Sequence, residues 1–186
     1  MPNRKFSSLN SRTNHSLDVS KHRKMIHLIV GNTGSGKTTY SNRLKEKTKG
    51  IIFSIDKWNK ILFLPDKTDK DGLEWFLKRI ERAESIILSL ILQLERAGID
   101  SILDLGLSKF EHREKFRKFA KINNIKVKIH FLDISKETRL KRIFKRNDEK
   151  GETFEFEVTR ENFEFMESWF EKPTEIELKN GILINE

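Results

Sequence analysis

The chain has 186 residues, a formal net charge of +9 and no cysteine. This length suits one domain with a proper hydrophobic core, and the lack of cysteine excludes a disulfide framework and any metal site built on thiolates. No apolar run approaches the roughly 18 residues that a membrane-spanning helix needs, and no secretory signal pattern follows the basic N-terminus. We therefore expect a cytoplasmic protein with no membrane segment.

Much of the positive charge lies at the N-terminus. Residues 1–24 hold six lysines and arginines against one acid, Asp18, and are rich in serine and asparagine with no sustained apolar period. This composition predicts a flexible basic tail in front of one domain over residues 25–186. A solvated tail is the favoured interpretation. The alternatives are a tail that contacts nucleic acid or acidic partners, and a transit peptide.

From residue 25 onward, short apolar runs alternate with helical patterns. The first elements are a strand over 25–30, a helix over 37–49, a strand over 51–55 and an amphipathic helix over 72–98, either unbroken or interrupted once. A strand over 99–105, a helix capped by Ser108 that runs to 123, and a strand over 125–132 follow. The last elements are a helix over 135–147 opened by Ser135, a helix over 159–170 and a strand over 181–184. Strands separated by helices predict an α/β protein with a mostly parallel five-stranded sheet.

The most specific motif lies between the first strand and the first helix. Residues 31–38, GNTGSGKT, match the spacing GxxxxGK[ST] at every fixed position. Glycines let backbone N–H groups face phosphate oxygens, Lys37 reaches the outer phosphates, and Thr38 ligates the Mg²⁺ that bridges them. The motif predicts a P-loop NTPase of three α/β/α layers, with ATP and Mg²⁺ as cofactors. The candidate nucleotide-binding residues are Gly31, Asn32, Thr33, Gly34, Ser35, Gly36, Lys37, Thr38 and Thr39.

The rest of the sequence narrows the class of P-loop protein. A GTPase reads guanine with Asn-Lys-x-Asp, but the only Asn-Lys pair, Asn59-Lys60, continues without that acid. A mechanical ATPase usually ends a strand in adjacent acidic residues, whereas the strand over 99–105 ends with the single acid Asp104. Both observations favour a protein that passes the phosphoryl group to another molecule.

Two carboxylates follow predicted strands. Asp56 comes at the end of the second strand, and in open α/β sheets ligands bind beyond the carboxyl ends of the strands. We predict that Asp56 accepts the proton of an acceptor hydroxyl; the alternative is an N-cap for a helix over 57–63. Asp104 is predicted to ligate Mg²⁺ directly or through water; the alternative is a turn-forming residue before Gly106.

A basic helix supplies the positive charge that phosphoryl transfer needs. Arg139, Arg142 and Arg146 lie at i, i+3 and i+7, which places them on one helix face. With the loop over 147–158, this helix is predicted to form a lid that closes over the nucleotide. The alternative is a solvated basic face.

These stretches together resemble a known group of proteins. GNTGSGKTTY, Asp56, LDLG at 103–106 and RLKRIFKRN at 139–147 are similar to small P-loop kinases, namely the kinase domains of polynucleotide 5′-kinases, chloramphenicol phosphotransferase and zeta toxins. Residues 130–178 resemble predicted bacterial kinases labelled AAA-family ATPases. The resemblance covers residues 25–178.

The resemblance implies roles for individual residues. It makes Asp56 the base for the acceptor hydroxyl and favours Arg142 and Arg146 over Arg139 as contacts to the donor phosphates. Polynucleotide kinases tend to carry an arginine beside the base, where this chain has Ile55 and Lys57, so a polynucleotide acceptor is not favoured; Lys57 replaces that arginine only in part.

The predicted function is therefore transfer of the γ-phosphoryl of ATP to a hydroxyl of a small molecule, with Lys37, Asp56, Arg142 and Arg146 as catalytic residues and Thr38 and Asp104 as metal ligands. The alternatives are a polynucleotide 5′-hydroxyl kinase and a nucleotide-binding regulator or zeta-toxin-like protein. An aromatic cluster is expected mostly to pack the C-terminal helix, with base stacking as the alternative. Its members are Phe154, Phe156, Phe163, Phe165, Trp169 and Phe170. Arg113 either faces the acceptor or lies on plain surface.

Overall fold

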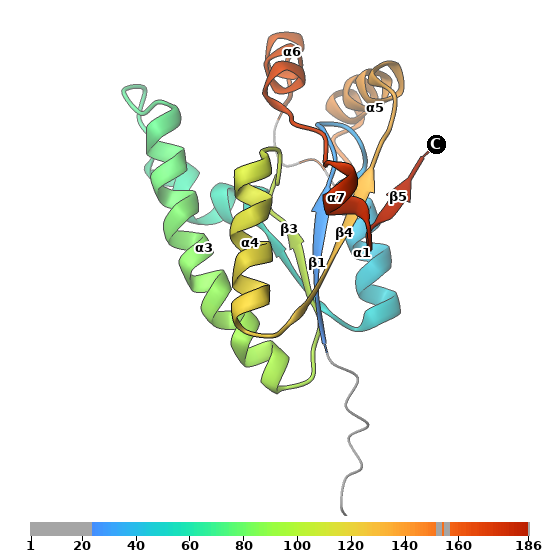
Figure 1. Ribbon diagram of the computed structural model, residues 1–186. Coiled ribbons are helices and arrows are strands. Elements are labelled where there is room, and N and C mark those ends of the chain that lie inside the picture. The colour runs from blue at the N-terminus through green and yellow to red at the C-terminus, as the bar shows by residue number, and fades with distance from the viewer. Residues whose placement is uncertain (1–23, 152–153, 155–156, 186) are drawn as a thin grey trace, which may run out of the picture.

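The computed structural model describes residues 24–151, 154 and 157–185 (Figure 1). Apart from Lys24, the predicted basic tail lies outside the described residues. Within them, all strand pairings are parallel and the sheet has the order β2-β3-β1-β4-β5. The prediction of a five-stranded, mostly parallel sheet is confirmed. The strands are β1 (Met25–Val30), β2 (Ile51–Ser54), β3 (Ser101–Asp104), β4 (Lys126–Leu132) and β5 (Ile182–Ile184).

Five of the helices fall close to the predicted ranges, whereas the short helices Ile55–Trp58 and Glu175–Leu178 are not among the predicted elements. The α-helices are α1 (Lys37–Thr48), α2 (Ile55–Trp58), α3 (Leu73–Arg96), α4 (Phe110–Ile122), α5 (Lys136–Glu149), α6 (Arg160–Trp169) and α7 (Glu175–Leu178). Two short turns follow α2, the π-helical η1 (Asn59–Phe63) and the 3₁₀-helical η2 (Leu64–Asp66). Helix α3 is continuous, which decides between the unbroken and the interrupted alternatives. None of the described helices is long and apolar enough to cross a bilayer.

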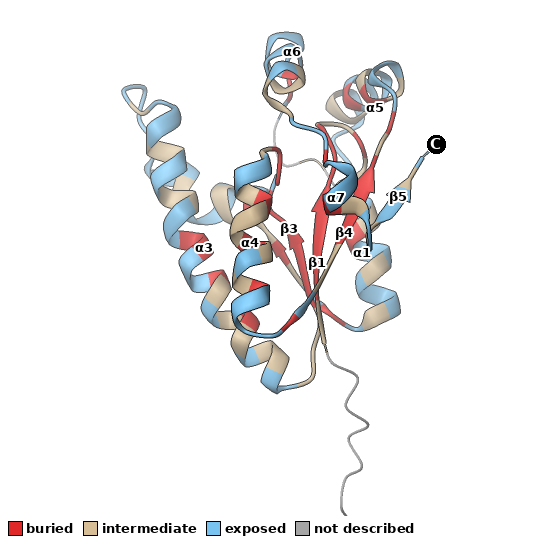
Figure 2. Ribbon diagram, viewed as in Figure 1, coloured by how far each residue is buried: buried red, intermediate tan, exposed pale blue. Residues whose placement is uncertain are grey.

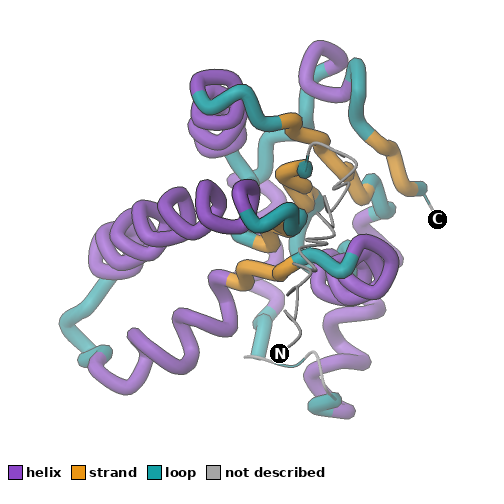
Figure 3. The backbone as a smooth tube through the Cα atoms, turned by 90° about the horizontal axis from the view of Figure 1, so that it is seen from below, coloured by secondary structure: helices purple, strands orange, loops and turns teal. Residues whose placement is uncertain are grey.

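The layers follow from the alternation of side chains along the strands. Ile26, Leu28 and Val30 of β1 point into the main core that α3 and α4 cover, while Ile29 points to the opposite face, where α1 packs. Successive residues of a strand face opposite sides of a sheet, so a strand buried on both faces is apolar at nearly every position. Figure 3 shows the helices on both sides of the strands, and Figure 2 shows the buried residues concentrated on the strands between them. The three-layer α/β/α arrangement is confirmed.

A helical lid stands beyond the ends to which the strands point. Helices α5 and α6 lie there side by side (Figure 1) and share a small core of their own, in which Ile143, Val158 and Phe163 are buried. Asn147 closes the intervening loop at its base, since its side chain donates to the Val158 carbonyl at 2.9 Å and accepts from the Val158 amide at 3.3 Å. Helices α5 and α6 are therefore packed against each other, and Asn147 ties the end of α5 to Val158, just before α6.

The start of α4 differs from the prediction. Ser108 does not cap this helix, because its hydroxyl donates to the Gly106 carbonyl at 3.0 Å. The Phe110 amide instead donates to the Glu171 carboxylate at 2.9 Å, a partner 61 residues away in sequence. A carboxylate from the segment after α6 thus satisfies a helix N-terminal donor that local sequence patterns assign to a nearby hydroxyl.

Arg113 also differs from both sequence interpretations. Its side chain is fully buried and forms an ion pair with the equally buried Glu177 of α7, with Nε 2.7 Å from the carboxylate. Further donors of the same guanidinium reach the carbonyls of Leu107 and Glu171. Arg113 neither faces an acceptor nor lies on the surface, but joins α4 to the C-terminal segment.

A polar chain crosses the sheet on the α1 side. His27 and His130 share a hydrogen bond of 2.9 Å, His27 lies 3.4 Å from the Asp100 carboxylate, and His130 bonds the Tyr40 hydroxyl at 2.8 Å. The pKa of His130 is lowered to about 4, mainly by burial and in smaller part by His27 and Lys128. Burial also lowers the pKa of His27, although Asp100 opposes the shift. The two histidines are therefore neutral at physiological pH.

Because both histidines are neutral in the folded chain, we expect the protein to lose stability in acid. The unfolded chain binds a proton near pH 6.5, whereas His130 stays neutral in the folded chain until about pH 4. The folded pKa is depressed, so stability falls as pH drops across this window, by on the order of 2 kcal/mol from this pair. Urea unfolding of the wild type and of His130→Gln at pH 4.5 and pH 7 measures the loss, which should be smaller in the variant. Equal losses in both proteins would contradict neutral burial of the pair.

Candidate active site

The P-loop joins the end of β1 to the start of α1 and requires glycine at two positions. Gly34 and Gly36 have φ values of +82° and +91°, in the left-handed region that side chains disfavour. A Cβ on Gly34 would also lie 2.7 Å from the Arg139 carbonyl oxygen. Gly36 precedes α1 without any side-chain cap, which leaves the first amides of this helix available for an anion.

Lys37 is the centre of the site. Its ammonium group donates to the carbonyls of Gly31 at 2.9 Å and Asn32 at 3.3 Å, so it is held against the loop. Burial lowers the pKa of Lys37, while the carboxylates of Asp104 and Asp56 raise it. These two acids, from different strand ends, therefore act electrostatically on the same ammonium group.

The side-chain oxygens of Thr38 and Asp104 lie close together, as two ligands of one metal ion would. The Thr38 hydroxyl donates to the Asp104 carboxylate at 3.0 Å. Burial raises the pKa of Asp104, and Lys37 and Thr38 oppose the shift. Mg²⁺ usually keeps several waters and binds through one or two carboxylates plus substrate phosphates, so this pair fits the ion when a nucleotide is present. Among the described residues no group of three or more acidic or histidine side chains holds a metal by itself.

Asp56 lies one step along the sheet from Asp104. The register pairs Ser54 with Asp104, which brings the β2 end beside the Thr38–Asp104 pair. Ser54 is the N-cap of α2, since its hydroxyl accepts from the Lys57 amide at 3.4 Å. The capping role considered for Asp56 therefore belongs to Ser54. Asp56 is exposed in the first turn of α2, and its carboxylate acts on both Lys37 and Arg146.

The three lid arginines have different surroundings. Arg139 is buried, and its guanidinium is occupied by Glu167 and by the carbonyls of Ile134 and Thr33. Arg142 is exposed and reaches the Ser35 carbonyl at 3.4 Å, which places it over the P-loop.

Arg146 is the lid arginine whose charge interacts with that of Asp56. Its Nε is buried and has no hydrogen-bond partner within the part of the chain that the structure describes. Burial lowers the pKa of Arg146, and Asp56 raises it. An unsatisfied buried donor in a site of this kind marks a group that a ligand oxygen can satisfy.

The aromatic cluster mostly packs the C-terminal segment, as expected. Phe163 is fully buried in the lid core, and Phe170 stacks on Phe131 with ring centroids 6.3 Å apart. Phe165 and Trp169 stack on each other at 5.8 Å, and Lys109 lies 4.3 Å above the Trp169 ring. Phe156 lies outside the described residues.

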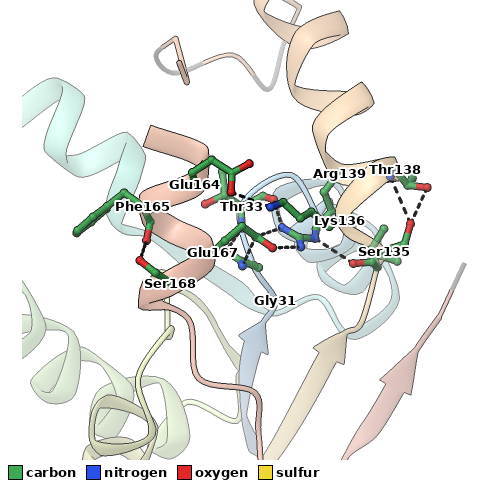
Figure 4. Close-up of polar contacts among 12 residues, drawn as sticks. Gly31, Thr33, Ser135, Lys136, Thr138, Arg139, Glu164, Phe165, Glu167 and Ser168 are labelled. Carbon is green, nitrogen blue, oxygen red and sulfur yellow. Dashed lines mark hydrogen bonds and ion pairs between the residues drawn. The ribbon is translucent and has the colours of Figure 1, made fainter. Parts of the chain in front are cut away.

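Glu167 is a site residue that sequence reasoning missed. It lies on α6 and bonds Arg139 (Figure 4). It also accepts from the side-chain amide of the P-loop residue Asn32. The only local signal is the i, i+3 spacing of Glu164 and Glu167, which places two acids on one face of α6. That pattern does not reveal which basic helix the acids face.

A scan against protein-family models places the chain in a family. The model described as an AAA domain matches residues 26–173, most of the chain, and the protein belongs to this family. A search of the curated proteins finds no match.

Solved structures share the fold. Kti12 of Chaetomium thermophilum, solved in complex with ADP-AlF3, is similar with a TM-score of 0.63 and 15% identity, over 86% of this chain and 88% of that one. A putative kinase of Chloroflexus aurantiacus has a TM-score of 0.64 and 16% identity, over 88% and 85%. The APS kinase CysC of Mycobacterium tuberculosis, in complex with AMPPNP and APS, has a TM-score of 0.57 and 18% identity, over 82% and 84%. The chain therefore has a P-loop kinase-like fold, and the resemblance seen in its sequence is confirmed.

Proposed function

We propose that the protein is an ATP-dependent kinase that transfers the γ-phosphoryl group to a hydroxyl of a small molecule. The observation that carries the proposal is the position of Asp56, two residues after the Ser54 that pairs with Asp104 in the sheet, where its charge acts on Lys37 and on Arg146. A kinase needs a carboxylate beside the phosphates that does not ligate the metal. Asp104 pairs with Thr38 and is assigned to the metal, so the role of base falls to Asp56.

The proposed roles follow from these positions. Lys37 and the loop amides hold the phosphates, and Arg142 and Arg146 offset the charge of the transferring group. The acceptor oxygen attacks the γ-phosphorus, the bond to the β–γ bridging oxygen breaks, and Asp56 takes the hydroxyl proton. When bound, Mg²⁺ neutralises charge on the phosphate oxygens, and Thr38 and Asp104 would hold it.

The segment that follows Asp56 in the chain favours a small acceptor, although it also exposes Lys57 and Lys60. The segment after Asp56 exposes the apolar side chains of Ile61, Leu62 and Leu64, which are 60%, 54% and 37% exposed. A polynucleotide is bound chiefly through its phosphates by basic side chains, and apolar side chains do not neutralise them. Apolar side chains instead suit the carbon skeleton of a compact organic acceptor.

The test is a transfer assay with γ-labelled ATP, Mg²⁺ and two acceptor sets, small hydroxyl compounds and oligonucleotides with a 5′-hydroxyl. Label on a small compound supports the proposal, and Lys37→Met should abolish it. Label on the oligonucleotides alone would assign a polynucleotide kinase instead. Release of labelled phosphate to water with neither acceptor labelled would make the protein an ATPase and refute transfer.

A further inference from the structure

A cluster of polar contacts, here called the Glu167 clamp and formed by Glu167, Arg139 and Asn32, joins the lid to the P-loop. Figure 4 shows Glu167 on α6 facing Arg139 on α5 beside the loop. Both Glu167 oxygens accept from the Arg139 guanidinium, one of them at 2.8 Å, and Oε1 also accepts from the Asn32 side-chain amide. The Glu167 carboxylate therefore bonds both α5, through Arg139, and the P-loop, through Asn32.

The clamp continues through Asn32 to the phosphate-binding lysine. The Asn32 side-chain oxygen accepts from the Thr33 amide at 2.7 Å, and the Asn32 carbonyl accepts from Lys37 at 3.3 Å. The side chain of Asn32 is therefore held at both ends, by Glu167 and by the loop itself. Displacement of Glu167 removes the outer contact and frees the residue that helps to orient Lys37.

Polar contacts rather than packing fix the position of Glu167. The three clamp residues line a cavity of about 330 Å³, whose other walls come from the end of β4, the loop after it, Lys136, Phe170 and Lys172. Glu167 is only partly buried, with its side chain 20% exposed. Open space beside the carboxylate means that the hydrogen bonds, and not surrounding side chains, determine where it sits.

We propose that Glu167 is a positioning residue that makes nucleotide binding depend on the docking of α6. When α6 is docked, Glu167 fixes Asn32 and, through it, Lys37; when α6 moves away, the loop loses this support. The role deepens the proposed function, since it concerns the same site, but it predicts an effect on nucleotide affinity that requires no acceptor.

The test compares variants by calorimetric titration with ADP and Mg²⁺. Glu167→Ala should weaken ADP binding about tenfold, because a charge-assisted hydrogen bond is lost at each partner. Glu167→Gln keeps an oxygen that accepts from Asn32 and should recover much of the affinity. Glu164→Gln is the matched control, since Glu164 lies on the same helix and pairs with the exposed Lys136 at 2.7 Å without touching the loop.

A double-variant cycle separates positioning from general stability. Asn32→Ala should weaken ADP binding to a similar extent as Glu167→Ala, and the double variant should be no weaker than the worse single one, because both act on one connection. Circular dichroism at the titration temperature checks that each variant is folded. Wild-type affinity in folded Glu167→Ala, or losses that simply multiply in the double variant, would overturn the proposal. Failure to find an acceptor would leave these affinities unaffected, so the two proposals fail separately.

Discussion

Replacement of Asp56 with asparagine is expected to lower the rate of phosphoryl transfer about a thousandfold, as loss of a general base typically does. Asparagine keeps the size and hydrogen-bonding geometry of the side chain but accepts no proton at neutral pH. Asp56 lies beside the P-loop without ligating the metal in our assignment, so ATP binding should change by less than about threefold. Single-turnover transfer and calorimetric titration with ATP measure the two quantities separately.

The matched control for Asp56 is Asp69→Asn. Asp69 is an exposed acid in the loop before α3, and its substitution removes the same charge from the same region of the sequence. It should leave both rate and affinity unchanged, since exposed charges at a distance are screened by solvent and salt. Full transfer activity in Asp56→Asn would exclude the base role and leave a binding protein as the better description.

Truncation of Glu177 to alanine is expected to lower the free energy of unfolding by about 3–5 kcal/mol, the usual result of removing one partner from a buried ion pair. The Arg113–Glu177 pair has both side chains fully buried, so Arg113 would keep an uncompensated charge. Glu177 also accepts from the Thr174 amide at 2.9 Å and completes a capping box at the start of α7. Urea unfolding measures the loss.

Two further variants sharpen this prediction. Glu175→Ala on the same short helix removes an exposed acid and should change stability by less than about 0.5 kcal/mol. Arg113→Met combined with Glu177→Leu removes both charges and should recover most of the lost stability, because an apolar pair of similar volume avoids the desolvation of two ions. A Glu177→Ala variant as stable as the wild type would show that the pair is not buried in solution.

Burial alone would raise the pKa of Glu177, but hydrogen bonds from Arg113 and Thr174 hold it below its ordinary value. A depressed carboxyl pKa contributes stability above the unfolded pKa that is lost as pH falls through the folded one. The acid sensitivity of Glu177 therefore adds to that of the histidine pair at the α1 face, and the His130→Gln comparison separates the two.

The sequence by itself determined the phosphate-binding loop, the five-stranded α/β architecture and most element boundaries. Local sequence patterns reveal these features, namely the spacing of glycines, the period of apolar residues and the alternation of strands with helices. Residues 31–38 carry their own backbone geometry because Gly34 and Gly36 adopt positive φ, and β1 shows its burial in a run that is apolar at every position except His27. The Asp56 prediction also came from local order, since a residue at the end of a parallel strand lies at the ligand-binding edge.

Only the tertiary structure decided which long polar side chains meet. Arg139 and Arg146 share one predicted helix face, yet Glu167 holds Arg139, while the Nε of Arg146 has no hydrogen-bond partner among the described residues. Glu171 accepts a hydrogen bond from the first turn of α4 although it lies 61 residues away from Phe110 in sequence, and Glu177 pairs with Arg113 across 64 residues. A side-chain ion pair needs a specific distance and orientation but no particular sequence separation, so only the packing of α5, α6 and α7 against the sheet selects the partners.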